Sequence, residues 1–231
     1  MLHNLKQIRG HKLAAIDGAI GQVKDFYFDD KTWAIRYLVA DTGNWLSGRQ
    51  VLLSPYSFGR LDQDGKVLSI NLTKKQIENS PSIDADRPVS RQYEENYYDY
   101  YGWPTYWEGG ALWGSSEYPE FMPKARPYNF VSYSYPRWDD IHLRSVNEVT
   151  GYNIQATDGE FGSISGFLVD QRKWLIRELT LETGHWYSGK EILITPTKIE
   201  RINYSESKVF VKLNKAELAR TEEKHLATAG V

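Results

Sequence analysis

The chain contains the same sequence pattern twice, and this repeat restricts its possible folds more than any other feature. When the 231-residue sequence is aligned with itself at an offset of 141 residues, identical residues coincide without a gap from Gly10 and Gly151 onward. The copies cover about residues 5–80 and 146–221, and a coincidence of this length indicates two homologous units. The shared residues that we take as the repeat signature are Gly18/Gly159, Gly21/Gly162, Trp33/Trp174, Arg36/Arg177, Gly43/Gly184, Trp45/Trp186, Gly48/Gly189 and Pro55/Pro196.

Each copy has the pattern of an all-β unit. Asp17 and Asp158 each precede a glycine, and Asp-Gly indicates a tight turn because glycine accepts positive φ. Short runs rich in β-branched and aromatic residues follow, and their spacing predicts a small barrel or sandwich. Each copy should close with a short helix capped by Thr73 or Asn214. The expected strands are 20–28, 33–40, 49–54 and 66–72 with 161–169, 174–181, 190–195 and 208–213, and the expected helices are 73–80 and 214–221.

The second expected strand of each copy has an irregular apolar pattern. Ile35 and Leu38 would point to opposite faces of a regular strand, and their counterparts in the second copy behave in the same way. A β-bulge near Arg36 and near Arg177 would bring both apolar sets to the interior. A strand buried on both faces at one end is the alternative.

The order Asp-Gly-x-x-Gly, Trp-x-Ile-Arg-x-Leu, Thr-Gly-x-Trp-x-Ser-Gly-Arg/Lys and Pro resembles the PRC-barrel family. Its members include the cytoplasmic domain of the photosynthetic reaction centre H subunit and the C-terminal domain of a ribosome maturation factor. Residues 33–55 and 174–196 carry the most specific part of the resemblance. It implies an all-β chain with two PRC-type barrels of about six strands each, at 1–80 and 143–231. It implies no single activity, because one fold hosts many functions.

The repeated Trp-x-Ser-Gly-basic segment has two interpretations. In the structural one, Trp45 and Trp186 cover a barrel end and Ser-Gly turns the chain into the next strand. In the functional one, a surface tryptophan and the basic residue, Arg49 or Lys190, bind an acidic partner or ligand.

Residues 81–142 between the copies have a different composition. They contain seven of the nine prolines, ten of the sixteen tyrosines and four of the eight tryptophans. Frequent proline and glycine predict an irregular linker, whereas so many rings have something to bury. We expect a strap over the barrels or over a second copy of the protein, with a partner-recognition surface as the alternative. The rings that distinguish these alternatives are Tyr97, Tyr101, Trp103, Trp107 and Trp113.

Composition and motifs disfavour several classes of function. A formal net charge of −2 and a pI of about 6.2 argue against a nucleic-acid binder. The absence of cysteine excludes disulfides and thiolate sites and fits a cytoplasmic protein. No apolar stretch has the length of a signal peptide core or a membrane span.

We also find no residue pattern that supports catalysis, a cofactor or a metal. His3, His11, His142, His185 and His225 lack metal-ligand spacing, and the segment Asp139-Asp140-x-His142 is better explained as a solvated turn. There is no nucleophile elbow, P-loop or dinucleotide fingerprint. No catalytic, cofactor-binding or metal-binding residue is therefore predicted.

The sequence thus favours a non-enzymatic protein-interaction or scaffold module. Resemblance to the H subunit implies docking on, or regulation of, a larger electron-transfer or membrane-associated complex. The alternative is a binding module of the ribosome-assembly or RNA-processing type, and a third possibility is a small-ligand binder or enzyme that uses the aromatic segment. The expected partner is a protein, with homodimerisation and peripheral membrane-complex association possible and nucleic acid disfavoured.

Overall fold

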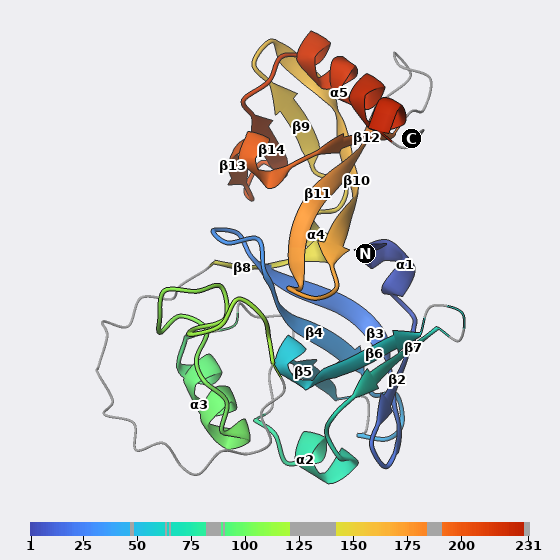
Figure 1. The fold of residues 1–231 in the computed structure, drawn as a ribbon, viewed down its shortest axis with the longest axis vertical. Coiled ribbons are helices and arrows are strands. Elements are labelled where there is room, and N and C mark those ends of the chain that lie inside the picture. Colours follow the sequence, from blue (N-terminus) through green and yellow to red (C-terminus); the bar gives the residue numbers. More distant parts are fainter. Residues whose placement is uncertain are drawn as a thin grey trace. The chain divides into compact units, whose positions relative to one another are not determined.

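The protein divides into two compact units in a computed structural model that describes residues 1–46, 49–62, 64, 66–81, 89, 91–120, 142–183 and 191–228 (Figure 1). The N-terminal unit comprises Gln7–Arg144 and Arg172–Trp174. The C-terminal unit comprises Met1–Lys6, Ser145–Gln171 and Leu175–Val231. The described residues between the two copies therefore belong to the N-terminal unit, and residues 1–6 belong to the C-terminal one.

The N-terminal unit is built on one sheet with the order β5-β4-β3-β2-β7-β6, and β8 also pairs with β3. Neighbouring strands are antiparallel, except for the parallel pair β2 and β7. The short elements α1, η1 and α2 connect or close the sheet. The bounds are β2 Lys12–Ala15, β3 Gly18–Asp29, β4 Ile35–Asp41, β5 Gln50–Leu53, β6 Phe58–Asp62, β7 Val67–Ile70, β8 Leu143–Ser145, α1 Leu5–Ile8, η1 Pro55–Ser57 and α2 Lys74–Glu78.

The C-terminal unit repeats this arrangement strand for strand. Its order is β12-β11-β10-β9-β14-β13, and β1 also pairs with β10. The predicted all-β fold of two small barrel-like units is therefore confirmed. The bounds are β1 Leu2–Asn4, β9 Asn153–Ala156, β10 Gly159–Asp170, β11 Leu175–Thr183, β12 Glu191–Ile194, β13 Ile199–Asn203, β14 Lys208–Val211, α4 Val146–Val149, η3 Pro196–Lys198 and α5 Lys215–Thr228.

The predicted bulge is present in both units. In the N-terminal unit Ile35 pairs with Phe28 and Tyr37 with Tyr27, so Arg36 is the additional residue. Ile176 and Glu178 have consecutive partners in the same way, which makes Arg177 the additional residue. A bulge redirects the side chains beside it, and it brings the apolar residues before and after it into one core. In the N-terminal unit the second alternative also holds, because every residue from 35 to 40 is buried.

Residues with an unusual backbone conformation occur at equivalent positions of the two copies. Four non-glycine residues of the described chain have positive φ, and they form two pairs at the repeat offset: Trp33 (63°) with Trp174 (49°), and Lys66 (51°) with Ser207 (51°). Positive φ is uncommon for residues with a side chain, so its recurrence reflects one shared hairpin geometry. The two tryptophans nevertheless differ in burial, because Trp174 is buried and Trp33 is half-buried.

The turn residues of the signature have structural roles. Asp17 accepts a hydrogen bond from the backbone N–H of Lys74 at 2.7 Å, and Asp158 accepts one from Lys215 at 2.9 Å. Each aspartate thereby binds the first turn of the helix that closes its unit. The predicted N-caps are also present, because Thr73 accepts from Gln76 and Asn214 from Glu217. The helix α5 continues to Thr228, beyond its predicted end at residue 221.

The glycines of the second signature pair, Gly21 and Gly162, are required because the backbone of the neighbouring strand approaches them closely. A Cβ added to Gly21 would lie 2.0 Å from the carbonyl oxygen of Asp41, and one added to Gly162 would lie 2.3 Å from that of Glu182. Only glycine lets the paired strands approach so closely. Gly18, Gly43 and Gly159 have the positive φ values of 139°, 53° and 132°, and Gly21 also has a positive φ, 124°. The prolines Pro55 and Pro196 begin the two 3₁₀ turns.

Candidate functional site

The most distinctive site of the protein is the contact between the aromatic segment and the sheet of the N-terminal unit. We call residues 91–118 the strap. The strap consists of α3 (Arg91–Tyr101) and the irregular chain that follows it. Its buried rings pack on Tyr37 of β4 and on Tyr56 of η1.

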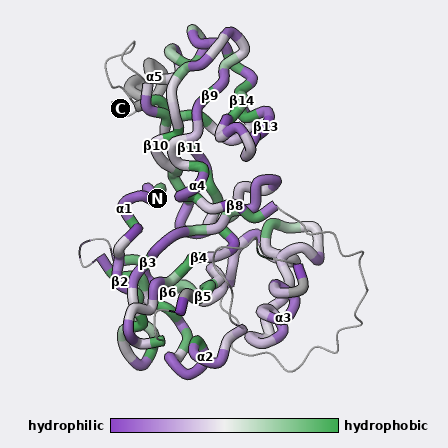
Figure 2. The backbone as a smooth tube through the Cα atoms, turned by 180° about the vertical axis from the view of Figure 1, so that it is seen from behind, coloured by the Kyte–Doolittle hydropathy of each residue, from purple (hydrophilic) through white to green (hydrophobic). Residues whose placement is uncertain are grey.

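The helix α3 corrects the prediction that the linker is irregular throughout. Residues 91–101 contain neither proline nor glycine, so nothing in this stretch interrupts a helix. The helix ends at Gly102, whose φ of 67° is typical of a helix C-terminus, and Pro104 follows. Figure 2 shows no hydrophobic colour along α3, because tyrosine scores as polar on a hydropathy scale although its ring can be buried.

One face of α3 is buried against the sheet. Glu94, Tyr97, Tyr98 and Tyr101 recur at helical spacing and are exposed by 5% or less. The residues of the opposite face, Glu95, Asn96 and Asp99, are exposed. The strap therefore packs through an aromatic stripe that carries one carboxylate.

Tyr97 binds the edge strand of the sheet through its hydroxyl group. The hydroxyl donates to the carbonyl oxygen of Leu52 at 3.1 Å and accepts from the N–H of Ser54 at 3.0 Å. An edge strand has backbone groups without a strand partner, and this phenol satisfies two of them. Burial raises the pKa of Tyr97 well above its ordinary value, so the hydroxyl keeps its proton.

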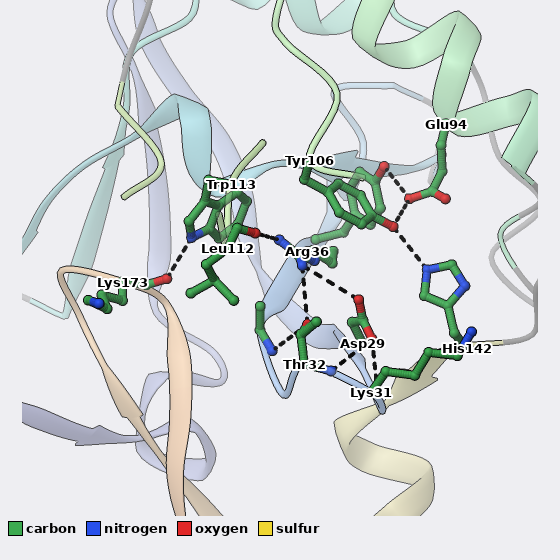
Figure 3. Close-up of polar contacts among 12 residues, drawn as sticks. Asp29, Lys31, Thr32, Arg36, Glu94, Tyr106, Leu112, Trp113, His142 and Lys173 are labelled. Atoms are coloured by element: carbon green, nitrogen blue, oxygen red, sulfur yellow. Dashed lines mark hydrogen bonds and ion pairs between the residues drawn. The ribbon is translucent and has the colours of Figure 1, made fainter. Parts of the chain in front are cut away.

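Glu94 lies at the centre of a buried polar network (Figure 3). Its Oε1 atom accepts hydrogen bonds from the hydroxyls of Tyr37 at 2.9 Å and Tyr106 at 2.7 Å. Its Oε2 atom lies 3.0 Å from Nη1 of Arg91. The Tyr106 oxygen is also 3.0 Å from Nε2 of His142. Since Tyr106 gives its only proton to Glu94, His142 donates from Nε2 in this arrangement.

Burial has the largest effect on the acidity of this carboxylate. Desolvation raises the pKa of Glu94 above its ordinary value of 4.5, although Arg91, the two phenols and His142 act in the opposite direction. The folded state therefore binds the Glu94 proton more tightly than the unfolded chain does.

This shift predicts how the stability of the unit depends on pH. Relative to Glu94→Gln, the wild-type free energy of unfolding should rise as the pH falls through the raised folded pKa toward about 4.5, because protonation removes a buried charge. Urea titrations at several pH values measure this difference between two proteins that both contain His142 and Arg91. Glu95→Gln, a change on the exposed face of α3, is the matched control and should reproduce the wild-type curve. A constant difference between wild type and Glu94→Gln would contradict the prediction.

Arg36 joins the strap to the bulge of β4 (Figure 3). Its side chain is buried and donates to the carbonyl oxygen of Leu112 at 2.8 Å and to Oγ1 of Thr32 at 3.1 Å. It lies 3.5 Å from Oδ2 of Asp29. The guanidinium carbon also stacks 3.8 Å from the ring centre of Tyr106 and 4.8 Å from that of Trp113. A guanidinium suits such a site because it donates hydrogen bonds to oxygen atoms in its own plane while its face stacks on aromatic rings.

The same ion pair is exposed in the C-terminal unit. Arg177 lies 4.0 Å from Asp170, and its side chain is 47% exposed. The positions that contact the strap in one unit also differ in the other, because Tyr37 corresponds to Glu178 and Tyr56 to Thr197. Only the first copy thus carries the rings that receive the strap, and this difference between the copies is the sequence signal that could have located its docking face.

The rings proposed as a partner surface are placed mainly in the interior. Tyr97, Tyr101, Trp103 and Trp113 are buried, and Trp107 is half-buried with the guanidinium of Arg91 4.1 Å from its ring centre. These positions agree with the strap interpretation. The alternative interpretation, an exposed partner surface, does not fit the four buried rings, because each packs against the sheet or within the strap.

The Trp-x-Ser-Gly-basic segment has a local role in the N-terminal unit. Arg49 donates to the carbonyl oxygens of Glu78 at 3.1 Å and Ser80 at 2.6 Å, at the end of α2. These contacts favour the structural interpretation of the segment, since the guanidinium binds the chain's own backbone. Trp45 is half-buried, with Nζ of Lys74 4.9 Å from its ring centre. Gly48 and residues 184–190, which include Gly184, Trp186, Gly189 and Lys190, lie outside the described residues.

The described residues contain neither a cluster of metal ligands nor a membrane-spanning helix. In that part of the chain no group of three or more His, Asp or Glu side chains could hold a metal ion. No helix there is long and apolar enough to cross a membrane.

The fold and the duplicated geometry define a class of protein with two small β-barrels. Within this class, residues 3–77 match the model of the PRC-barrel domain family, so the first copy is a PRC-barrel domain, as the resemblance predicts. The strap lies outside the matched residues. The second copy is related to the first by the gapless offset and the common strand order.

The chain is also similar to a protein of Deinococcus radiodurans described as an uncharacterized protein. The two are 37% identical over 73 residues, which are 32% of this chain and 26% of the relative. The chain thus spans about a quarter of that relative's length. The family is compatible with a protein-interaction module and indicates no particular complex.

Proposed function

We propose that the chain is a non-enzymatic protein-interaction module whose partner binds the C-terminal unit at the face around Arg177. The observation that supports this proposal is the contrast between the two copies of one ion pair. Arg36 and Asp29 are buried beneath the strap, whereas Arg177 and Asp170 occupy the equivalent bulge with the arginine exposed. The first copy uses this face for a protein segment of its own chain, so the fold is suited to bind another segment there.

The strap contact also indicates the chemistry of such a partner. In the N-terminal unit the bulge arginine donates a hydrogen bond to a backbone carbonyl oxygen and stacks on the faces of two aromatic rings. In the C-terminal unit η3 contacts β11, and its residues Thr197 and Lys198 are hydrophilic and exposed. We therefore propose a partner that presents carbonyl or carboxylate oxygens together with an aromatic ring. The cytoplasm is the compartment proposed, because a chain without cysteine needs no oxidising environment.

Affinity capture with matched variants tests this proposal. Arg177→Ala combined with Lys198→Ala should abolish the recovery of proteins that the wild-type chain captures from native lysate, since the bulge arginine and the exposed lysine of η3 are lost. Lys12→Ala combined with Lys75→Ala, at exposed positions of the N-terminal unit, removes the same charge and should leave the recovery unchanged. Quantitative mass spectrometry gives the readout, and thermal melts verify folding. Equal recovery by the two double variants would reject this face as the binding site.

A further inference from the structure

The first strand of each unit is supplied by the other copy. In the C-terminal unit β10 is paired over two separate stretches on one side: Gly159–Ser163 pairs with β9, and Leu168–Asp170 pairs with β1. The strand β1 lies at the start of the chain, before the first copy. In the N-terminal unit the strand that pairs in this way with β3 is β8, which precedes the second copy. Leu2 and Leu143 are related by the repeat offset of 141, so the exchange is reciprocal.

Each of the long strands β3 and β10 consequently has a stretch of edge that no strand of its own copy pairs with. Without β1, the backbone groups of Leu168–Asp170 on that side would have no strand partner, and an open edge of this kind readily accepts another strand. The register is antiparallel, with Leu2 opposite Asp170, His3 opposite Val169 and Asn4 opposite Leu168. The edge is therefore a defined acceptor site for a short strand.

Side chains add specificity to the backbone pairing. His3 is buried, and its Nε2 atom lies 2.8 Å from Oε1 of Gln171. A Cβ at Gly166 would lie 2.9 Å from Oγ1 of Thr180 and 3.3 Å from Oδ1 of Asn4, so glycine leaves room both for β11 and for the β1 strand. The backbone N–H of Gln171 donates to the carbonyl oxygen of Met1 at 3.5 Å. The acceptor site thus selects a segment with the sequence of this chain's own N-terminus.

We propose that a second copy of this chain fills the acceptor site, so that two chains exchange β1 strands and form a dimer. The two homologous copies within one chain already exchange their first strands, and the contacts would be identical if the strand came from another molecule. Within one chain the tether gives β1 an effective concentration in the millimolar range, which favours the monomer at low protein concentration. The exchanged dimer should therefore form when the chain refolds at high concentration. This partner is independent of the one proposed for the Arg177 face.

Cysteine pairs can distinguish the two arrangements because the natural chain contains no cysteine. His3 and Val169 are directly opposite and both buried, and opposite residues of antiparallel strands have Cα atoms about 4.5–5.5 Å apart, within reach of a disulfide. A His3→Cys chain and a Val169→Cys chain are mixed in urea, refolded together over a range of concentrations and oxidised mildly. We expect a covalent heterodimer whose fraction rises with protein concentration and that a reducing agent dissociates.

Two controls make the experiment decisive. The double variant His3→Cys, Val169→Cys, refolded at low concentration, should form a disulfide within the monomer. Mixing His3→Cys with Leu168→Cys should give little cross-linking, because Leu168 is opposite Asn4 and its side chain lies on the other face of the strand. If the double variant cross-links as a monomer while the mixed chains give no heterodimer at any concentration, exchange between molecules is refuted. Failure of the double variant to cross-link would refute the strand pairing on which the proposal rests.

Discussion

Arg36→Ala is expected to lower the free energy of unfolding of the N-terminal unit by about 3–5 kcal/mol, the usual result of removing one partner from a buried ion pair. Asp29 would remain buried without its cation, and the carbonyl oxygen of Leu112 would lose its donor. The rings of Tyr106 and Trp113 would lose the group that lies between them. Urea denaturation followed by tryptophan fluorescence measures the change.

The duplication provides a matched control for this variant. Arg177→Ala removes the same side chain from the same bulge, but the exposed pair with Asp170 should contribute no more than about 1 kcal/mol. The ratio of the two effects therefore reports on the strap rather than on the barrel. Similar destabilisation by both variants would show that the arginine supports the bulge itself and that the strap adds little.

Trp113→Ala should destabilise the N-terminal unit by about 3–5 kcal/mol, as is typical when a buried aromatic ring is truncated. The Trp113 ring is fully buried and packs 5.3 Å from the ring centre of Tyr56. Its Nε1 group donates to the carbonyl oxygen of Lys173 at 2.9 Å, so the variant would also leave that oxygen without this donor. Thermal and urea unfolding give the readout.

Trp107→Ala is the control for this second variant. Trp107 belongs to the same strap but is only half-buried, so its truncation should cost clearly less. Because Arg36 and Trp113 are in contact, the double variant Arg36→Ala, Trp113→Ala should lose less than the sum of the two single variants. A Trp113→Ala protein with the wild-type melting temperature would mean that the strap does not stabilise this unit.

These expectations assign different roles to the two copies of one fold. The N-terminal unit incorporates the strap as part of its structure, with Tyr97 on the sheet edge and Glu94 between two phenols. The C-terminal unit keeps the equivalent bulge hydrophilic and its arginine exposed. A duplicated chain can thus keep one copy for stability while the other presents a surface to a partner.

Several features of the fold could be predicted from the order of the residues. The turn at Gly18 and the bulge at Arg36 depend on the preferences of a few neighbouring residues, and each recurs in the second copy. The helix α3 was missed because proline and glycine were counted over the whole linker, whereas residues 91–101 contain neither.

The repeat, four strands of each barrel and the aromatic excess of the linker follow from patterns that are local in the sequence or compare one copy with the other. The burial of Arg36, the position of Glu94 between Tyr37 and Tyr106, and the exchange of β1 and β8 follow only from the tertiary structure. Arg36 and Arg177 occupy the same motif, yet one is buried and the other exposed, because a segment more than fifty residues away in sequence covers only the first. Burial depends on which distant surface packs over a residue, and a strand can pair with any edge that its backbone reaches; neither property is encoded by the residues beside it.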